Sequence, residues 1–459
     1  MSSSAAKPDV PGGLPGNRGS SVGDLTLAAG DDRRRWLILL IGLIAMTAGC
    51  TFQYGIAYLI PALRHDGFSL VRAGFLVACP TIGLLLTLIG WGAVADRRGE
   101  RLVLASGLSV AGVVLIAGRS VHGYAGLAVC FGLAGAAGGS VFAASGRLIL
   151  GWFARHERGL AMGIRQSAQP LGVALAAATL PALGASGTTL PLTALGGFCL
   201  VAAALVVVFV RDPVRRQEPG DASSAADADG PVRPPSPYRQ PVLWRIHAAS
   251  ALLVVPQFTV ATFALVYLVD ARGWAAVSAG RLLAIAQACG ALSRLAAGYW
   301  SDRAGSRMRP MRILALATAA GMAGLAAAVA AGSTAAVPIL LACSVVAVST
   351  NGLAFTAVAE YAGSSWAGRA LGIQNTGQNA LAAATPPVLA LAIGSAGFGA
   401  SFAVVAVFPL VAALFVPVSA ERAAMPGGRG QPDRPDRPDR PDAPDRPDLP
   451  DQPAYGIRS

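Results

Sequence analysis

Long apolar stretches recur along almost the whole chain, and they constrain its fold more than any other feature. A helix rises 1.5 Å per residue, so about 20 apolar residues cross the roughly 30 Å hydrocarbon core of a bilayer. Stretches of that length, bounded by Gly, Pro or charged residues, predict membrane-spanning helices. We expect twelve of them, at residues 36–62, 70–95, 102–119, 124–151, 159–184, 188–210, 244–270, 275–300, 311–331, 335–361, 368–393 and 397–418.

The composition excludes several classes of protein. With 54% hydrophobic and 13% charged residues, the chain is too apolar for a conventional soluble surface. The net charge of +12 does not indicate a nucleic-acid partner, because basic residues around helix ends are explained by membrane topology. All six cysteines fall in apolar stretches without metal-ligand spacing, so we expect no disulfides, no metal and no cofactor.

Three polar segments frame two sets of six helices. Residues 1–35 lack the early apolar core of a cleavable signal and predict a disordered cytoplasmic tail. Residues 211–243 predict a flexible cytoplasmic linker, and the Pro-Asp-Arg repeats of residues 419–459 predict a disordered tail. The expected domains between them are two six-helix bundles, 36–210 and 244–418.

The distribution of arginines predicts the orientation in the membrane. With the amino terminus inside, arginines are concentrated in the inner loops and are sparse in the outer ones. We therefore expect a multi-pass protein of the plasma or inner membrane with both termini in the cytoplasm.

A charged loop motif occurs once in each half. The first copy reads Gly92-Ala-Val-Ala-Asp96-Arg97-Arg-Gly99-Glu-Arg101, and the second reads Gly298-Tyr-Trp-Ser-Asp302-Arg303-Ala-Gly305-Ser-Arg307. A second echo, at nearly the same offset, pairs the segment from Gly159 to Gln169 with the segment from Gly368 to Gln378. The two halves are therefore expected to be structural repeats.

Both loops resemble the Gly-x-x-x-Asp-Arg-x-Gly-x-Arg signature of the major facilitator superfamily, which lies between helices two and three and recurs between eight and nine. With the helix number and the linker, the resemblance covers about residues 36–418. It implies an all-α integral membrane fold of twelve transmembrane helices in two pseudo-symmetric bundles. The bundles of this family rock about a central site, which gives alternating access.

The motif residues are expected to close the inner face. Gly lets neighbouring helices approach, the acid at a helix end can meet arginines or helix dipoles, and the Arg-Gly pair makes a tight turn. Arg147 and Glu360 end the fourth and tenth helices and are expected to join this gate rather than bind substrate. The alternative is that the motif only fixes topology. The expected gating residues are Gly92, Asp96, Arg97, Gly99, Arg101, Gly298, Asp302, Arg303, Gly305, Arg307, Arg147 and Glu360.

The chain lacks the parts of an ATP-driven pump or an intramembrane enzyme. Its only lysine, Lys7, follows Ala6, so the Gly-Lys pair of a P-loop is absent. There is no His/Glu metal pair, and His156 and His247 are expected near separate helix ends. Secondary transport is the remaining prediction, and we expect no enzymatic activity.

Arg294 is the first candidate for contact with a substrate. It lies about 12 Å along its helix from Asp302, and an intramembrane charge costs about 2.5 kcal/mol or more. The matching residue in the first half is Leu88, so the loop motif does not require this arginine. An arginine here also resembles the oxalate/formate and monocarboxylate branches of the superfamily, where it contacts the substrate carboxylate. The alternative is an arginine satisfied by carbonyl groups or by snorkelling.

Polar residues on the fifth and eleventh helices predict a shared wet cavity. Arg165 and Gln169 lie one turn apart, and their counterparts are Gln374 and Gln378. Hydrogen-bonded packing between helices is the alternative. The expected substrate-binding residues are Arg294, Arg165, Gln169, Gln374, Gln378, Asn375, Tyr54 and Gln53.

These observations predict a monomeric secondary transporter of a small organic anion, such as a monocarboxylate, with a proton as a candidate co-substrate. Multidrug efflux is the first rival, but the helix-four arginine of such antiporters is Phe131 here, and their Gly-Pro-Gly-Gly type motif reads Gln169-Pro170-Leu171-Gly172. A membrane sensor that signals through the linker or the tail is a remote alternative.

Overall fold

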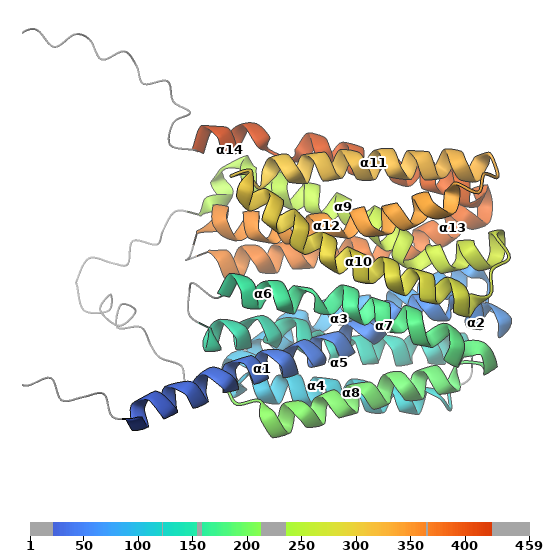
Figure 1. Ribbon diagram of the computed structural model, residues 1–459. Coiled ribbons are helices and arrows are strands. Elements are labelled where there is room, and N and C mark those ends of the chain that lie inside the picture. The colour runs from blue at the N-terminus through green and yellow to red at the C-terminus, as the bar shows by residue number, and fades with distance from the viewer. Residues whose placement is uncertain (1–21, 122, 154–157, 213–235, 364–365, 425–459) are drawn as a thin grey trace, which may run out of the picture. The chain divides into compact units, whose positions relative to one another are not determined.

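The computed structural model describes residues 22–121, 123–153, 158–212, 236–363 and 366–424. Every regular element in these residues is helical (Figure 1). The α-helices are α1 (Val22–Gly55), α2 (Ile60–His65), α3 (Leu70–Arg98), α4 (Glu100–Gly118), α5 (Tyr124–Trp152), α6 (Arg158–Gln166), α7 (Ala168–Leu183), α8 (Thr189–Phe209), α9 (Pro241–Val266), α10 (Ala276–Arg303), α11 (Met308–Ala330), α12 (Ala336–Ala362), α13 (Ala367–Phe415) and α14 (Val418–Ala424). Short 3₁₀ helices are η1 (Ile56–Leu59), η2 (Gly184–Ser186) and η4 (Pro237–Arg239), and η5 (Tyr267–Ala271) is a short π-helix.

The described residues contain 11 helical segments that are long and apolar enough to cross a membrane. One of them includes α13, whose 49 residues would extend for roughly 74 Å as a straight helix, more than twice the thickness of a hydrocarbon core. Gly397 interrupts α13 with non-helical angles (φ 77°), so this element supplies two spans joined by a turn. The predicted fold of twelve transmembrane helices is therefore confirmed.

Three segment boundaries differ from the sequence predictions. Helix α1 begins at Val22, within the expected tail 1–35, because residues 22–35 lack proline and include several good helix formers. The expected linker 211–243 ends before residue 243, because η4 lies within it and α9 already begins at Pro241. Proline is favoured in the first turn of a helix. At the other end of the chain, α14 occupies the start of the expected tail 419–459. Residues 1–21, 213–235 and 425–459 of these three segments lie outside the description.

The spanning helices belong to one structural unit that ends at Val418. In the first half, α3 and α4 pack on α5, and α8 packs on α4; in the second half, α9 and α11 pack on α13, and α10 packs on α12. The halves meet along two pairs of helices, α3 with α13 and α7 with α10. The second pair can be followed in Figure 1.

The unit has two ends, which we name by their loops. The motif end carries the turns after α3 and α10, at Gly99 and Gly305; the far end carries the turns before α3 and α10, at Gly67 and Gly273. Gly99 and Gly305 have φ of 88° and 57°, a region in which residues with a Cβ are strained. The glycine of each copy of the motif is therefore required by the turn itself.

The two halves pack closely at the far end. A Cβ on Gly74 of α3 would lie 2.7 Å from the Ala390 Cβ, and one on Gly280 of α10 would lie 2.4 Å from the Ala177 carbonyl oxygen. An ion pair between Arg64 and Asp270 joins the halves at the same end. These contacts close the far end of the interface.

The first glycine of each motif copy does not have the expected packing role in this conformation. A Cβ on Gly92 or Gly298 would meet no atom of another element within 4 Å. The close approach of α3 to α5 is instead made at Gly83, where a Cβ would lie 2.0 Å from the Gly132 carbonyl oxygen. The motif glycines therefore face open space in this conformation.

The contrast between Gly83 and Gly90 on α3 gives a test of this packing. Replacing Gly83 with Ala forces α3 away from α5 and should lower the free energy of unfolding by about 1–3 kcal/mol. Gly90→Ala, in open space on the same helix, should be neutral or slightly stabilising. Thermal unfolding of the purified proteins in detergent measures the difference, and equal unfolding temperatures would contradict the packing.

Candidate functional site

Arg294 of α10 lies at the interface of the two halves and is held by three neutral oxygens. Its Nε donates to the Val348 carbonyl at 3.0 Å, its Nη1 to the Gln166 carbonyl at 3.2 Å, and its Nη2 to Gln169 Oε1 at 3.2 Å. Val348 belongs to the same half, whereas Gln166 and Gln169 belong to the other. Three of the five guanidinium donors are thus engaged, and no carboxylate is among the acceptors.

The backbone of α10 is fixed beside this arginine. The Ser293 hydroxyl is hydrogen-bonded to the Val345 carbonyl at 3.1 Å and to the Ser349 hydroxyl at 2.7 Å. With the Val348 bond, these contacts attach α10 to α12. The position of Arg294 relative to its own half is therefore set by bonds that do not involve the opposite half.

Arg294 borders a small cavity of about 20 Å³, space for about one water molecule. Tyr54 and Gln169 come from the first half, and Gln257 and Gln287 come from the second. The rest of its wall is apolar and consists of Pro170, Val173, Phe258, Ala261 and Val348. The predicted residues Arg294, Gln169 and Tyr54 therefore share one cavity.

Two amides at the cavity, those of Gln169 and Gln257, have their oxygens engaged and their nitrogens available. A guanidinium has only donors, so the Gln169 oxygen must face Arg294, which leaves the Gln169 NH₂ group. In the same way, Gln257 Oε1 accepts a hydrogen bond from Asn351 at 2.9 Å, which leaves the Gln257 NH₂ group. The polar part of the cavity is thus rich in hydrogen-bond donors and carries a positive charge.

Tyr54 connects the two halves across the cavity. Its hydroxyl donates to Asn379 Oδ1 at 3.3 Å, and its ring packs against Phe258 with 5.4 Å between ring centroids. The Asn379 amide in turn donates to Asn375 Oδ1 at 3.1 Å. The predicted residue Asn375 therefore reaches the site through Asn379 and does not line the cavity.

Arg165 lies deeper in the first half. Its Nε donates to the Ser145 hydroxyl at 2.9 Å, and its Nη1 donates to Gln166 Oε1 at 3.2 Å. The described acceptors of Arg165 are therefore also neutral.

Gln374 and Gln378 belong to a buried network inside the second half. Gln374 binds His247 Nδ1 and the Ser250 hydroxyl through its two amide atoms, and Gln378 Nε2 donates to the same hydroxyl at 2.6 Å. His247 Nε2 is 3.0 Å from the Tyr238 hydroxyl of η4. The structure favours the packing alternative for both amides, because their partners lie within the second half and neither residue lines the cavity.

Gln53 is buried against α3 rather than exposed to the cavity. Its Nε2 donates to the Thr81 hydroxyl at 3.4 Å, while its Oε1 has no hydrogen-bond partner among the described residues. The expectation that Gln53 lines the site with Tyr54 is therefore not met, since adjacent residues of a helix point in different directions.

Charged residues of the second motif copy form a cluster at the motif end. Arg307 binds Asp302, and its Nη2 donates to Glu360 Oε1 at 3.0 Å. Burial acts to lower the pKa of Arg307, but its bonds to Glu360 and Asp302 act more strongly, so the pKa is raised and the guanidinium stays charged. Arg303 lies 4.7 Å from the centre of the Tyr299 ring.

The first motif copy is attached to the end of α8. The Arg101 N–H donates to Asp212 Oδ1 at 2.7 Å, and the Arg101 guanidinium binds the Val207 carbonyl. Arg97 is exposed. The side chains of Asp96 and Arg147 lie outside the description, so their predicted part in a gate stays a prediction.

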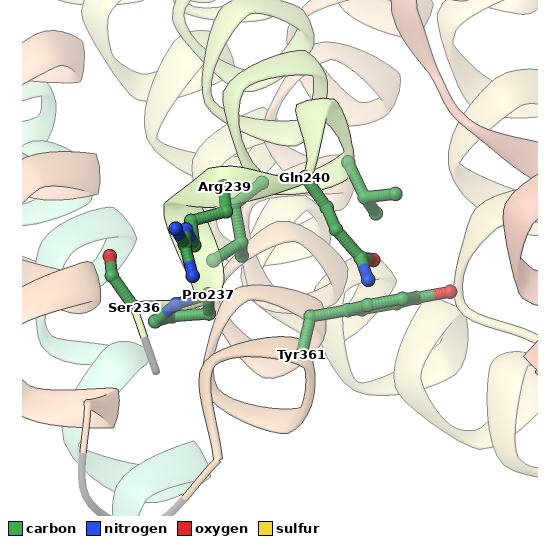
Figure 2. Close-up of a pocket in the computed structure, with 7 residues that line it drawn as sticks. Ser236, Pro237, Arg239, Gln240 and Tyr361 are labelled. Atoms are coloured by element: carbon green, nitrogen blue, oxygen red, sulfur yellow. The ribbon is translucent and has the colours of Figure 1, made fainter. Parts of the chain in front are cut away.

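A second and larger cavity, of about 300 Å³, lies at the motif end of the second half (Figure 2). Its wall includes Ser236, Arg239, Gln240 and Tyr361, from the residues before α9 and the end of α12. Arg239 and Gln240 are exposed side chains. No residue lines both this cavity and the cavity at Arg294.

Sequence reasoning missed Gln166, Ser145 and Phe258. A backbone carbonyl as the partner of an arginine carries no signal in the side-chain pattern, and Ser145 and Phe258 are ordinary residues for an apolar helix. The proline at position 170 was the available signal for Gln166, because proline has no N–H to donate to the carbonyl four residues earlier. Within the described residues, no group of three His, Cys, Asp or Glu side chains could hold a metal ion.

Comparisons with known proteins agree with this architecture. Residues 37–386 match the family model described as Major Facilitator Superfamily. An uncharacterized MFS-type transporter of Mycobacterium tuberculosis (strain ATCC 25618 / H37Rv), Rv2994, is 44% identical over 386 residues, which cover 84% of this chain and 85% of the relative. A second MFS-type transporter from strain CDC 1551 / Oshkosh, MT3072, is 44% identical over the same length.

Solved structures share the fold at low sequence identity. A bacterial homolog of the human lysosomal transporter Spinster, in an inward-facing and occupied conformation, has a TM-score of 0.69 and 13% identity, with coverage of 87% of this chain and 99% of that chain. A D-xylose-proton symporter has a TM-score of 0.65 and 17% identity, with coverage of 83% and 98%.

The placement of Gln374 predicts a structural rather than a ligand-binding role. Gln374→Leu leaves His247 Nδ1 without its acceptor, which should cost about 1–3 kcal/mol of stability. The matched control is Thr376→Ala on the same helix, because the exposed Thr376 hydroxyl binds only its own helix at Gly372. Thermal unfolding should separate the two variants, and full stability of Gln374→Leu would contradict this role.

Proposed function

The chain belongs to the major facilitator superfamily and is a membrane transporter of that type, and from this premise we propose that it is a secondary transporter of a small organic anion, such as a monocarboxylate. The single observation that carries the proposal is the cationic site at Arg294, whose described acceptors are all neutral.

The charge of the site supports an anionic ligand. Arg294 and Arg165 lie within the membrane-spanning part of the chain, and their described hydrogen bonds go to carbonyl, amide and hydroxyl oxygens. A charge buried without a counter-charge costs several kcal/mol. A bound anion would offset that cost, and a cation would increase it.

The remaining groups favour a carboxylate with a small apolar body. The free NH₂ groups of Gln169 and Gln257 can donate to carboxylate oxygens, and the planar guanidinium of Arg294 suits two parallel bonds. The apolar wall at Val173 and Phe258 would face the rest of such a molecule. In this proposal, Arg294 anchors the charge, the two amides orient the carboxylate, and Arg165 adds positive potential.

The closed far end supports alternating access through the motif end. Arg64 with Asp270 and the contact at Gly280 close one side of the interface, so we propose that the ligand exchanges on the other side. We also propose that the motif residues, with Arg307, Asp302 and Glu360 as one cluster, close that side in the opposite conformation. The motif end would then face the cytoplasm.

Efflux of hydrophobic compounds is the competing function, and the apolar wall of the cavity is the observation that favours it. A neutral apolar compound would leave the present hydrogen bonds of Arg294 unchanged. The two functions therefore differ in what they require of the guanidinium.

Replacing Arg294 separates these functions. Arg294→Gln should weaken carboxylate binding by about 10-fold to 100-fold, because hydrogen bonds to a charged group contribute about 1.5–3 kcal/mol. Arg294→Lys should keep part of the affinity, because it keeps the charge but loses the paired donors of the planar guanidinium. The measurements are propionate and benzoate binding to the purified protein and counterflow in liposomes, with and without a pH gradient.

The control for that experiment is Arg281→Gln, an exposed arginine on the same helix, which should leave binding unchanged. Wild-type counterflow in Arg294→Gln would remove the anion proposal. Drug resistance on overexpression that persists in Arg294→Gln would support efflux instead.

The orientation gives a further prediction. Reporters fused after Arg101 and after Arg307 should both be found in the cytoplasm, because both motif turns lie at the motif end. Alkaline phosphatase and fluorescent-protein fusions report the two sides of the bilayer. Reporters on opposite sides would contradict alternating access through this pair of loops.

A further inference from the structure

Pro170 of α7 leaves a backbone carbonyl without its helical partner. In a continuous helix, the carbonyl of residue 166 accepts a hydrogen bond from the N–H of residue 170, but proline has no N–H. Helix α6 ends at Gln166, α7 begins at Ala168, and the Ser167 N–H bonds back to Gly163 and Ile164. The Gln166 carbonyl is therefore an acceptor inside the membrane that its own helix cannot use.

Arg294 of the opposite half supplies the missing donor. Its Nη1 donates to the Gln166 carbonyl, its Nη2 donates to Gln169 Oε1, and both distances are 3.2 Å. One oxygen for each terminal nitrogen is also how a carboxylate binds a guanidinium in a bidentate pair. The two oxygens of this segment therefore contact Arg294 in the manner of a carboxylate, without its charge.

A true carboxylate would bind the same two nitrogens more strongly. A guanidinium bond to a carboxylate, N⁺–H···O⁻, is about 2.7–2.9 Å long and is stronger than a guanidinium bond to a neutral oxygen. The Arg294 bonds to Gln166 and Gln169 are longer than that range. The Nε bond to Val348 lies within Arg294's own half and can persist when the other two are exchanged.

We propose that the Gln166 carbonyl and Gln169 Oε1 act as an internal substitute for the transported anion, and that Pro170 is the positioning residue that frees the carbonyl. In the empty protein, the two oxygens connect the junction of α6 and α7 to α10 across the interface of the halves. A bound carboxylate takes both terminal nitrogens of Arg294 and breaks that connection. The identity of the displacing anion rests on the proposed function, whereas the connection itself does not.

The first test is Pro170→Ala, which restores the N–H of residue 170. That N–H can then donate to the Gln166 carbonyl within the helix. Propionate should bind about threefold to tenfold more tightly, because it competes with one oxygen fewer. In the ligand-free protein, hydrogen–deuterium exchange of peptides from α10 should become faster. The control is Pro409→Ala, the same change in the part of α13 after Gly397, and it should alter neither quantity.

The second test is Gln169→Glu, which places a real carboxylate beside Arg294. Propionate binding should weaken by at least about tenfold, and exchange in α10 should become slower, because a charged oxygen holds the guanidinium more tightly. Opposite effects of the two variants cannot come from a general loss of folding. Both are made in the full-length protein.

The outcomes separate this inference from the proposed function. Unchanged propionate affinity and unchanged α10 exchange in Pro170→Ala would overturn the internal substitute. If the wild type binds no carboxylate but Pro170→Ala still loosens α10, the substrate class is wrong and the connection stands. If Arg294→Gln abolishes binding while Pro170→Ala and Gln169→Glu both weaken it, the connection is wrong and the anion site stands.

Discussion

A guanidinium in the middle of a membrane cannot remain without acceptors, and the centre of this protein is organised around meeting that need. Arg294 takes one carbonyl from its own half and two oxygens from the other, so a single side chain links α12, α10 and the junction of α6 and α7. These oxygens satisfy hydrogen bonds but leave the charge uncompensated. In the proposed function, this residual charge gives the site its preference for a ligand of opposite sign.

Small residues and prolines determine how closely the surrounding helices approach. Gly74 and Gly280 bring the halves together at the far end, and Gly83 brings α3 against α5. The glycines at 99 and 305 have a different task, because their positive φ angles make the turns of the charged motif. The same residue type therefore serves packing in one place and chain reversal in another, which residue type alone does not distinguish.

Much of the fold was predictable from the sequence, because a membrane requires long apolar segments and the motif marks the repeat. The gathering of Arg294, Gln169 and Tyr54 was predictable from the cost of polar groups in hydrocarbon. The hydrogen-bond partner of Gln374 was not predictable, because His247 lies 127 residues away and only the folded chain brings the two together. Helical periodicity gives the face of a residue, whereas hydrogen-bond partners depend on the packing of other helices.

The α7–α10 interface combines two kinds of contact that respond differently to a ligand. Toward the far end, the Ala177 carbonyl and Pro181 pack against Gly280, and these contacts depend only on how close the helices are. Toward the centre, the bonds of Arg294 depend on which oxygens compete for it. The α3–α13 interface has the first kind of contact at Gly74, against Pro386 and Ala390. In the proposed function, an anion at Arg294 would therefore act on one of the two interfaces between the halves and would couple binding to their relative movement.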